Sequence, residues 1–161
     1  MSDVLNIPTY INYKKIVPEA IEPTFGSQCA AGMDLYALCE EPVTIQPGET
    51  HMIHTGIAIE IPYKFFGAIY PRSGLASKRG LRLANCVGVV DADYRGEVMV
   101  PLHNDSDKPQ TIENGDRIAQ LVIQPYLYVE LVEKDKLSST VRGTGGFGST
   151  GVHTRGNVND R

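Results

Sequence analysis

The sequence predicts an all-β domain of the sandwich, jelly-roll or barrel type, with one short helix. Hydrophobic residues recur with a period of two along much of the chain, as in strands that bury one face. Turn-forming pairs separate these alternations at short intervals. With 161 residues, 42% hydrophobic and 21% charged, the chain has the size and composition of a single globular domain.

The clearest alternation runs from His51 to Ile61 and predicts one strand. One face would carry Ile53, Thr55, Ile57, Ile59 and Ile61, and the other His54, Gly56, Ala58 and Glu60. Shorter alternations predict strands at Val43 and Ile45, Phe65 to Ile69, Val98 to Leu102, and Leu121 and Ile123. Turns are expected at Pro47-Gly48, Arg95-Gly96, Asn104 to Pro109 and Asn114-Gly115, and the short helix over Gly74 to Arg79.

The alternation stops near Leu137, which predicts a β domain over residues 1–137 and a C-terminal arm over 138–161. The arm has little to bury and contains a glycine-rich motif at 142–151, so it is expected to be flexible unless it binds something. Its Gly143, Gly145 and Gly148 form a literal G-x-G-x-x-G. A dinucleotide-binding fingerprint needs a preceding strand and a following helix, so we reject that interpretation.

The composition limits the classes of partner and compartment. A formal net charge of −4 argues against a nucleic-acid binder. No apolar run has the length of a membrane span, no targeting segment is seen, and three cysteines without CxxC spacing favour free thiols. We therefore expect a cytoplasmic or otherwise reducing location. His51 and His54 form an HxxH, which an ordinary pair of strand histidines explains better than a zinc site.

Two segments have the residue types that bind phosphate. In the arm, Arg142 supplies a fork of donors, Ser149 and Thr150 supply hydroxyls, and Phe147 offers a flat face for a nucleobase. The alternative for the arm is a solvated tail. Residues 71–80 form a turn that presents Arg72 and Ser73, and taken alone this pattern favours a basic solvated loop over a phosphate site.

Three further patches carry isolated polar residues. Residues 85–97 predict a hairpin with Asp91, Asp93 and Tyr94 near its tip, where a carboxylate can deprotonate a water or simply be solvated. Asp34 stands among small and apolar residues, so it needs either a structural hydrogen-bond partner or a metal. Gln120 interrupts an apolar run and would need partners if buried.

Together these patches closely resemble the five motifs of the trimeric deoxyuridine triphosphatase (dUTPase) family, in that family's order. The matching segments are residues 30–35, 72–75, 88–96, 115–121 and 142–151, and the match extends from about Ile11 to Gly151. The resemblance implies a β jelly roll assembled as a homotrimer with shared active sites. It also implies Mg²⁺-dependent hydrolysis of dUTP to dUMP and pyrophosphate by water attack on the α-phosphorus, which lowers dUTP and supplies dUMP for thymidylate synthesis.

The resemblance also implies residue roles. Asp91 activates the water, and Asp34 contacts magnesium through coordinated water. Asn85 and the hairpin backbone read uracil, Tyr94 packs on deoxyribose, and Phe147 covers the base. The full set of implied substrate-binding residues is Arg72, Ser73, Gly74, Asn85, Gly88, Val90, Tyr94, Gln120, Arg142, Phe147, Gly148, Ser149 and Thr150.

Two other functions compete with this one. A dCTP deaminase shares the fold and assembly, but the pattern Asp91-Ala-Asp-Tyr94 favours the hydrolase. A non-enzymatic β-sandwich, such as a capsid or partner-binding module, would explain the strands without explaining Asp91 together with the glycine-rich arm.

Overall fold

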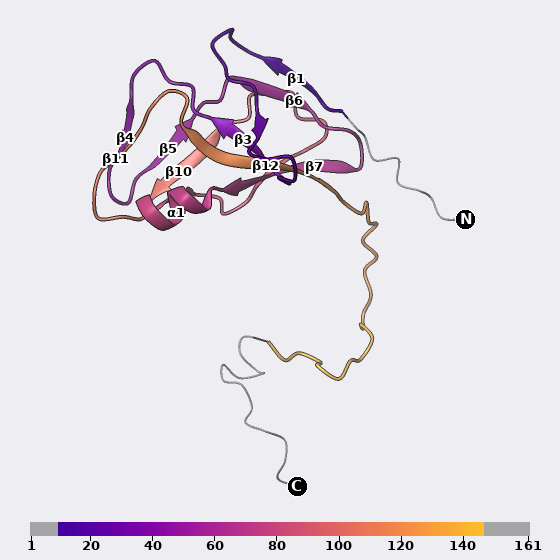
Figure 1. Cartoon of the computed structure of the whole chain (residues 1–161). Coiled ribbons are helices and arrows are strands. Elements are labelled where there is room, and N and C mark those ends of the chain that lie inside the picture. The colour runs from indigo at the N-terminus through magenta and orange to yellow at the C-terminus, as the bar shows by residue number, and fades with distance from the viewer. Residues whose placement is uncertain (1–9, 147–161) are drawn as a thin grey trace. The chain divides into compact units, whose positions relative to one another are not determined.

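The computed structural model describes residues 10–146, and its contacts divide the chain into two units, Met1–Tyr128 and Val129–Arg161. The first unit is the β body, which Figure 1 shows as packed strands with one short helix. The predicted division into residues 1–137 and an arm stays a prediction, because a contact boundary does not define a functional domain.

A five-stranded antiparallel sheet organises the body. Its order is β2 (Thr24–Phe25), β3 (Met33–Tyr36), β12 (Arg117–Pro125), β7 (Phe65–Pro71) and β9 (Gly88–Val90). The long β12 pairs with β3 on one side and β7 on the other. The β12 residues Ile118, Ala119 and Leu121 are almost fully buried because they pack into the hydrophobic core.

Three smaller antiparallel sheets complete the body. In the three-stranded sheet the order is β5 (Thr50–Ile53), β10 (Val100–Asn104) and β8 (Leu81–Leu83). One two-stranded sheet pairs β1 (Asn12–Lys15) with β6 (Ile57–Glu60). The other pairs β11 (Gln110–Ile112) with β4 (Val43–Ile45). Helix α1 (Ser73–Arg79) joins β7 to β8 and ends at Gly80, whose φ of 65° is left-handed. The predicted all-β class and the short helix are confirmed, the helix starting one residue earlier than expected.

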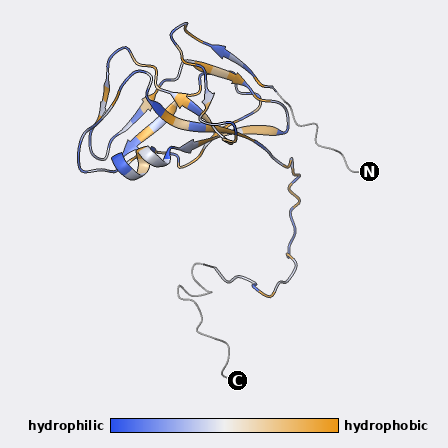
Figure 2. Cartoon of the chain, in the orientation of Figure 1, coloured by the Kyte–Doolittle hydropathy of each residue, from blue (hydrophilic) through white to orange (hydrophobic). Residues whose placement is uncertain are grey.

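The core lies between these sheets and is built from branched aliphatic side chains. Ile45, Val100, Ile112 and Ala119 are fully buried, and Figure 2 shows the hydrophobic colour concentrated on the strands inside the body, while α1 is largely hydrophilic. Burying these side chains is the main favourable contribution to folding.

The prediction of a single strand over 51–61 is wrong, although its buried face is right. Ile53, Thr55, Ile57, Ile59 and Ile61 are all buried. However, the chain leaves β5 at Ile53, turns, and enters β6 at Ile57 in another sheet. Gly56 makes the turn with φ 67°, and a Cβ there would lie 2.7 Å from both Ala20 Cβ and Leu38 Cδ2.

The predicted hairpin over 85–97 is also corrected. Strand β9 pairs with β7, whereas β10 pairs with β5 and β8, so the two arms of the segment enter different sheets. The turn lies at Ala92-Asp93 rather than at Arg95-Gly96, and it is closed by the Tyr94 N–H, which donates to Asp91 O at 3.1 Å. The two arms are thus free to stand apart.

In the second unit, residues 129–146 are described. The Gly143 N–H donates to Thr140 O, and the Gly145 N–H donates to Arg142 O, each at 3.1 Å, forming two successive turns. Across residues 10–146, no helix combines the length and hydropathy that crossing a membrane requires.

Candidate active site

A hollow of ≈260 Å³ lies between the two arms of the 85–101 segment. It brings together five of the residues singled out from the sequence: Asn85, Gly88, Val90, Asp91 and Tyr94. Because the arms belong to different sheets, their backbones do not pair across this hollow in the part of the chain that the structure describes. The hollow therefore combines an apolar lining with backbone polar groups that can meet a ligand.

Asp91 stands at the rim, immediately after β9, and is exposed to solvent. Its backbone carbonyl is held in the Ala92-Asp93 turn by the Tyr94 N–H. The strand before it is fixed by the β7 ladder, with Gly67 opposite Val90. An exposed carboxylate on a fixed backbone can accept a proton from a bound water.

Tyr94 is held from two sides. Its hydroxyl donates to Glu97 O at 2.9 Å, and its ring lies against Gly96, where a Cβ would be 2.4 Å from the Tyr94 hydroxyl oxygen. Tyr94 as a residue is 42% exposed, so it remains available to a ligand. Gly96 is thus needed because a larger residue would displace the ring.

Asn85 lies at the opposite wall, in the turn that precedes β9. The Val87 N–H donates to Asn85 O at 2.6 Å, and Cys86 has a left-handed φ of 61°. A Cβ on Gly88 would lie 3.1 Å from Ile69 Cβ and 3.3 Å from Asn85 Nδ2. Glycine at this position therefore allows close approach both to β7 and to the Asn85 amide.

A second cluster surrounds Asp34, whose side chain is 4% exposed. Arg72 Nε lies 3.0 Å from Asp34 Oδ1 as an ion pair, and Arg117 Nη1 donates to Oδ2 at 3.2 Å. Oδ1 nevertheless accepts no aligned hydrogen bond within the described residues. The two guanidinium groups compensate the buried carboxylate, as the structural interpretation of Asp34 required.

The other predicted phosphate-binding residues adjoin this cluster. Arg72 precedes α1 and leads into Ser73 and Gly74, which are exposed. Gln120 lies opposite Asp34 on one side and Tyr70 on the other. It is half-buried rather than buried, so it keeps part of its amide for a ligand.

The Asp34 cluster and the Asp91 hollow lie at opposite ends of β7. The register sets Val90 opposite Gly67, so Asp91 leaves the sheet next to Phe66. Arg72 follows six residues later along β7, which is roughly 20 Å in an extended strand. Within one chain, Asp91 and Arg72 therefore do not face a common small ligand.

Two residues of these clusters were missed by the sequence argument. Arg117 belongs to the matching segment 115–121, and the need of Asp34 for a hydrogen-bond partner is the signal that could have pointed to it. Glu97 lines the Asp91 hollow from the far arm. Nothing in the sequence distinguishes it from a solvated glutamate.

The Glu97 carboxylate takes part in three hydrogen bonds beside the hollow. Its Oε1 accepts the N–H of Gly56 at 2.7 Å and that of Thr55 at 3.0 Å, and His54 Nδ1 lies 2.8 Å from Oε2. Partial burial alone would raise the pKa of Glu97, but the bonds from His54, Gly56 and Thr55 outweigh it and lower that pKa.

No cluster of three or more acidic, histidine or cysteine side chains suited to a metal is present within residues 10–146. His54 pairs with Glu97, whereas His51 lies 3.6 Å from Glu49. A metal held mostly by protein ligands therefore does not fit. A Mg²⁺ ion held mainly by substrate phosphates does fit, because it needs few protein ligands and the buried Asp34 Oδ1 has no hydrogen-bond partner within the described residues.

The arm is described in part. Arg142 is exposed, and its Nε donates to Gly145 O at 2.8 Å. Phe147, Gly148, Ser149 and Thr150 lie outside the described residues.

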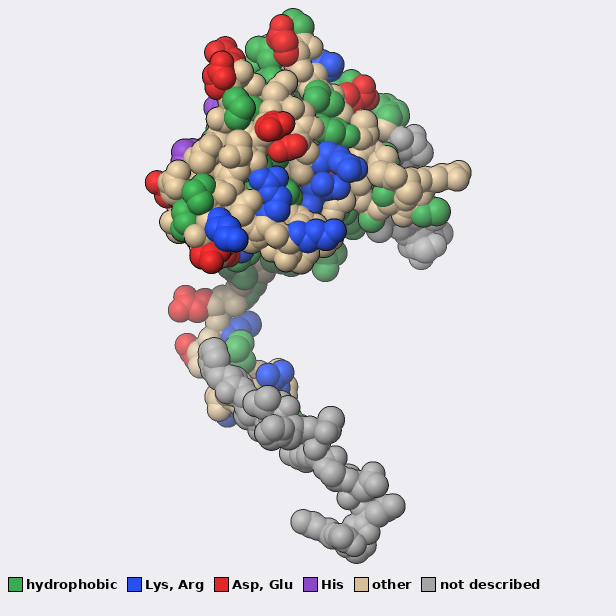
Figure 3. All heavy atoms as spheres, turned by 60° about the vertical axis from the view of Figure 1, so that its left-hand side comes forward, with side chains coloured by type: hydrophobic (Ala, Val, Ile, Leu, Met, Phe, Trp, Pro, Cys, Tyr) green, Lys and Arg blue, Asp and Glu red, His purple; other side chains and the backbone are tan. Residues whose placement is uncertain are grey.

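Basic side chains gather on the side of the body where α1 lies, with acidic side chains above them in the view of Figure 3. Helix α1 contributes Lys78 and Arg79 in its last turn and carries no acidic residue in its first. Although the net charge is −4, this face can attract a polyanionic ligand.

The dUTPase family model matches residues 19–151 of the chain. The chain belongs to the dUTPase family. It is 50% identical to the deoxyuridine 5'-triphosphate nucleotidohydrolase of Desulfitobacterium hafniense over 131 residues, which cover 81% of this chain and 87% of that protein. The corresponding Rickettsia akari protein is 51% identical over 130 residues, or 81% and 88% of the two chains.

Solved structures of the dUTPase family agree with this assignment. The dUTPase of Staphylococcus bacteriophage 80alpha, in complex with dUPNHPP, superposes with a TM-score of 0.82 at 30% identity. The alignment covers 90% of this chain and all of that one. The body is therefore the β jelly roll of the dUTPases, as the sequence predicted.

Proposed function

We propose that this dUTPase-family chain is a dUTP diphosphatase, which hydrolyses dUTP to dUMP and pyrophosphate. The observation that carries the proposal is the hollow between the arms of segment 85–101, with Asp91 at its rim and Asn85, Gly88 and Tyr94 in its walls. Relatives of 50% identity are named for this activity.

In the proposed mechanism, the nucleoside enters the hollow with uracil between the arms. Asn85 and the backbone of Gly88 to Val90 bond the edge of the base, and Tyr94 packs on the deoxyribose. Asp91 accepts a proton from the water that attacks the α-phosphorus, and pyrophosphate leaves. The exposed position of Asp91 supports this role because water reaches its carboxylate directly.

The triphosphate would meet the Asp34 cluster. Arg72, Ser73, Gly74 and Gln120 are the proposed contacts, and Arg117 joins them as a second cation fixed by Asp34. The family works with a divalent metal ion, and we propose Mg²⁺ here, with Asp34 accepting from one of its waters. When bound, Mg²⁺ neutralises phosphate charge in the leaving pyrophosphate.

We propose that a homotrimer builds each site from more than one chain. The support is the separation of roughly 20 Å along β7 between Asp91 and Arg72. Only a neighbouring copy can bring a second Asp91 hollow up to the Arg72 cluster. The arm would close such a site, with Arg142, Gly148, Ser149 and Thr150 on phosphates and Phe147 over uracil.

The test is product identification. The full chain is incubated with each deoxynucleoside triphosphate and Mg²⁺, and we expect dUMP and pyrophosphate from dUTP. Release of ammonia from dCTP would instead identify a deaminase. An absence of turnover, together with no thermal stabilisation by dUTP, would identify a non-enzymatic module and refute the proposal.

A further inference from the structure

The wall of the hollow that contains Tyr94 needs an anchor of its own. The opposite wall is fixed by the β7–β9 ladder from Gly67 to Ile69. Residues 92–97 lie outside the strands of the sheets. At its far end the backbone of Glu97 forms an isolated antiparallel bridge with Ala58. Between that bridge and the Ala92-Asp93 turn, the segment is held by side-chain bonds, which include that of Arg95 Nη1 to Ala92 O at 2.7 Å and that of the Tyr94 hydroxyl to Glu97 O.

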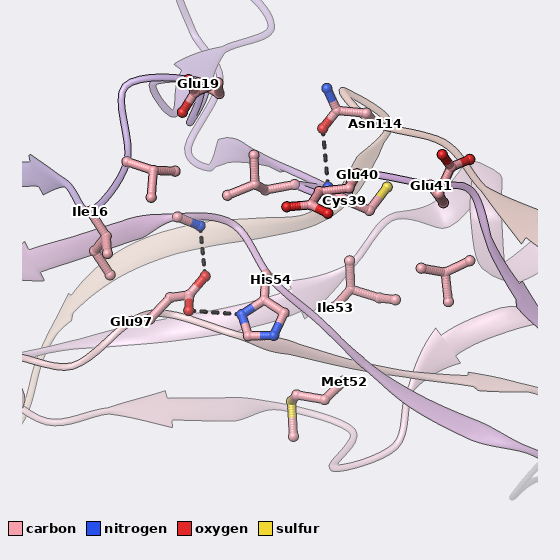
Figure 4. A pocket seen from close by; sticks show the side chains of 14 residues that line it. Ile16, Glu19, Cys39, Glu40, Glu41, Met52, Ile53, His54, Glu97 and Asn114 are labelled. Atoms are coloured by element: carbon pink, nitrogen blue, oxygen red, sulfur yellow. Dashed lines mark hydrogen bonds and ion pairs between the residues drawn. The ribbon is translucent and has the colours of Figure 1, made fainter.

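Glu97 connects this wall to the rest of the body. Figure 4 shows its carboxylate directed at His54 and at a backbone N–H of the turn between β5 and β6. With the N–H groups of Thr55 and Gly56 on one oxygen and the His54 ring on the other, both oxygens are engaged. The Glu97 side chain is 19% exposed, and its bonds from the Thr55 and Gly56 N–H groups are partly buried, whereas its bond with His54 faces solvent.

The turn that receives Glu97 is rigid. Thr55 is 1% exposed, and its hydroxyl donates to Val98 O at 2.6 Å. Gly56 is wedged against Ala20 and Leu38 with no room for a side chain. The Val98 N–H also donates to Ile57 O at 2.8 Å. Turn 54–56 therefore forms a preformed cradle for the Glu97 carboxylate.

We infer that Glu97 is a positioning residue for substrate selection, because its carboxylate in the 54–56 cradle fixes the wall on which Tyr94 meets the sugar. The inference rests on the proposed dUTP hydrolysis. Glu97 bonds the cradle with its side chain and Tyr94 with its backbone carbonyl, so the position of the ring follows that of Glu97. A ring that is held firmly rejects a 2'-hydroxyl, whereas a ring that moves tolerates one.

The experiment compares Glu97→Ala with Glu97→Gln in the full chain. Glutamine can still accept from the turn N–H groups and donate to His54, whereas alanine cannot. For Glu97→Ala we expect the dUTP-over-UTP ratio of kcat/KM to narrow by at least about tenfold, with KM for dUTP rising more than kcat falls. For Glu97→Gln we expect a ratio within about threefold of the wild type, since the neutral amide keeps the geometry.

The matched control is Glu49→Ala. Glu49 also bonds a backbone N–H of a turn, that of Gln46 at 2.9 Å, but it does not line the hollow. We expect the wild-type ratio for this variant. If folded Glu97→Ala kept the wild-type ratio, or if Glu97→Gln narrowed it equally, the positioning role would be refuted.

Two further measurements keep the test decisive. Should Glu97→Ala not fold, Glu97→Asp shortens the side chain by one methylene, so that the carboxylate cannot reach all three of its donors at once, and an unchanged ratio there would overturn the inference. Calorimetric binding of dUMP and UMP needs no turnover, and the preference for dUMP should weaken in Glu97→Ala. If the wild type bound dUMP without hydrolysing dUTP, the proposed function would fail while this binding comparison still tested Glu97.

Discussion

At the scale of single residues, the two key aspartates have opposite surroundings. Asp34 is buried between Arg72 and Arg117, whereas Asp91 is exposed at the rim of the hollow. A buried carboxylate that lies between two guanidinium groups holds those cations in place. An exposed carboxylate can meet water freely, which favours Asp91 as the general base.

Replacing Asp91 tests this difference directly. Asp91→Asn keeps the shape of the side chain but removes its capacity to accept a proton. We expect unchanged folding and dUTP binding, with kcat lowered by about 10²–10⁴-fold. Steady-state kinetics and calorimetry on the same preparation check both parts, and a near-normal kcat in the folded variant would exclude Asp91 as the base.

Glu97 gives a prediction of pH dependence. Its bonds to His54, Gly56 and Thr55 lower its pKa in the folded protein below the ordinary 4.5. A depressed carboxyl pKa stabilises the fold above the unfolded value, and that contribution is lost as the pH falls through the folded value. The unfolding free energy of the wild type should therefore exceed that of Glu97→Gln by its largest margin at pH 7. This margin should decrease below about pH 4.5. Urea unfolding across this range measures it, and a margin that stayed constant would contradict the prediction.

At the scale of elements, the turn between β5 and β6 has consequences that alternation does not reveal. The chain must leave one sheet and enter another within three residues, and Gly56 allows this with a left-handed φ. The same turn supplies the backbone donors that bind Glu97. The turn that separates β5 from β6 thus also holds Glu97 at the candidate site.

Gly56→Ala should be strongly destabilising. An added Cβ would lie 2.7 Å from Ala20 and from Leu38, in a backbone conformation that alanine disfavours. We expect a loss of about 2–4 kcal/mol in unfolding free energy. Gly48→Ala is the control: its φ is 78°, yet nothing lies within 4 Å of an added Cβ. It should cost only about 1 kcal/mol, and equal losses in the two variants would refute the packing argument.

At the scale of the whole molecule, the separation of Asp91 and Arg72 along β7 predicts complementation between subunits. Chains carrying Asp91→Asn and chains carrying Arg72→Ala should each be nearly inactive. When they are unfolded together and refolded as mixed trimers, about a quarter of the wild-type activity should return, because a shared site draws the two residues from different chains.

Mixing the two variants without unfolding is the control and should restore little activity at first. If the refolded mixture also stayed inactive, while native mass spectrometry showed mixed trimers, each site would be contained within one chain. In that case the shared-site proposal would be wrong.

The sequence by itself determined the class of fold and the buried face of its clearest alternation. Period-two alternation identified the buried face of residues 53–61 correctly, because successive side chains of an extended chain point alternately to the core and to solvent. Asn85, Gly88, Asp91 and Tyr94 were singled out together, and the structure places them around one hollow. The buried face is a local feature that neighbouring residues reveal, whereas the set of candidate site residues came from the resemblance to the dUTPase motifs.

Only the tertiary structure decided which strands pair and which distant residues meet. Alternation continues across Gly56, so it could not show that β5 and β6 belong to different sheets, nor that the two arms of segment 85–101 stand apart. Likewise, Asp34 meets Arg117 across 83 positions, and Glu97 meets Gly56 across 41. Such contacts depend on sheet order and register, which arise from the packing of the whole core rather than from any local pattern.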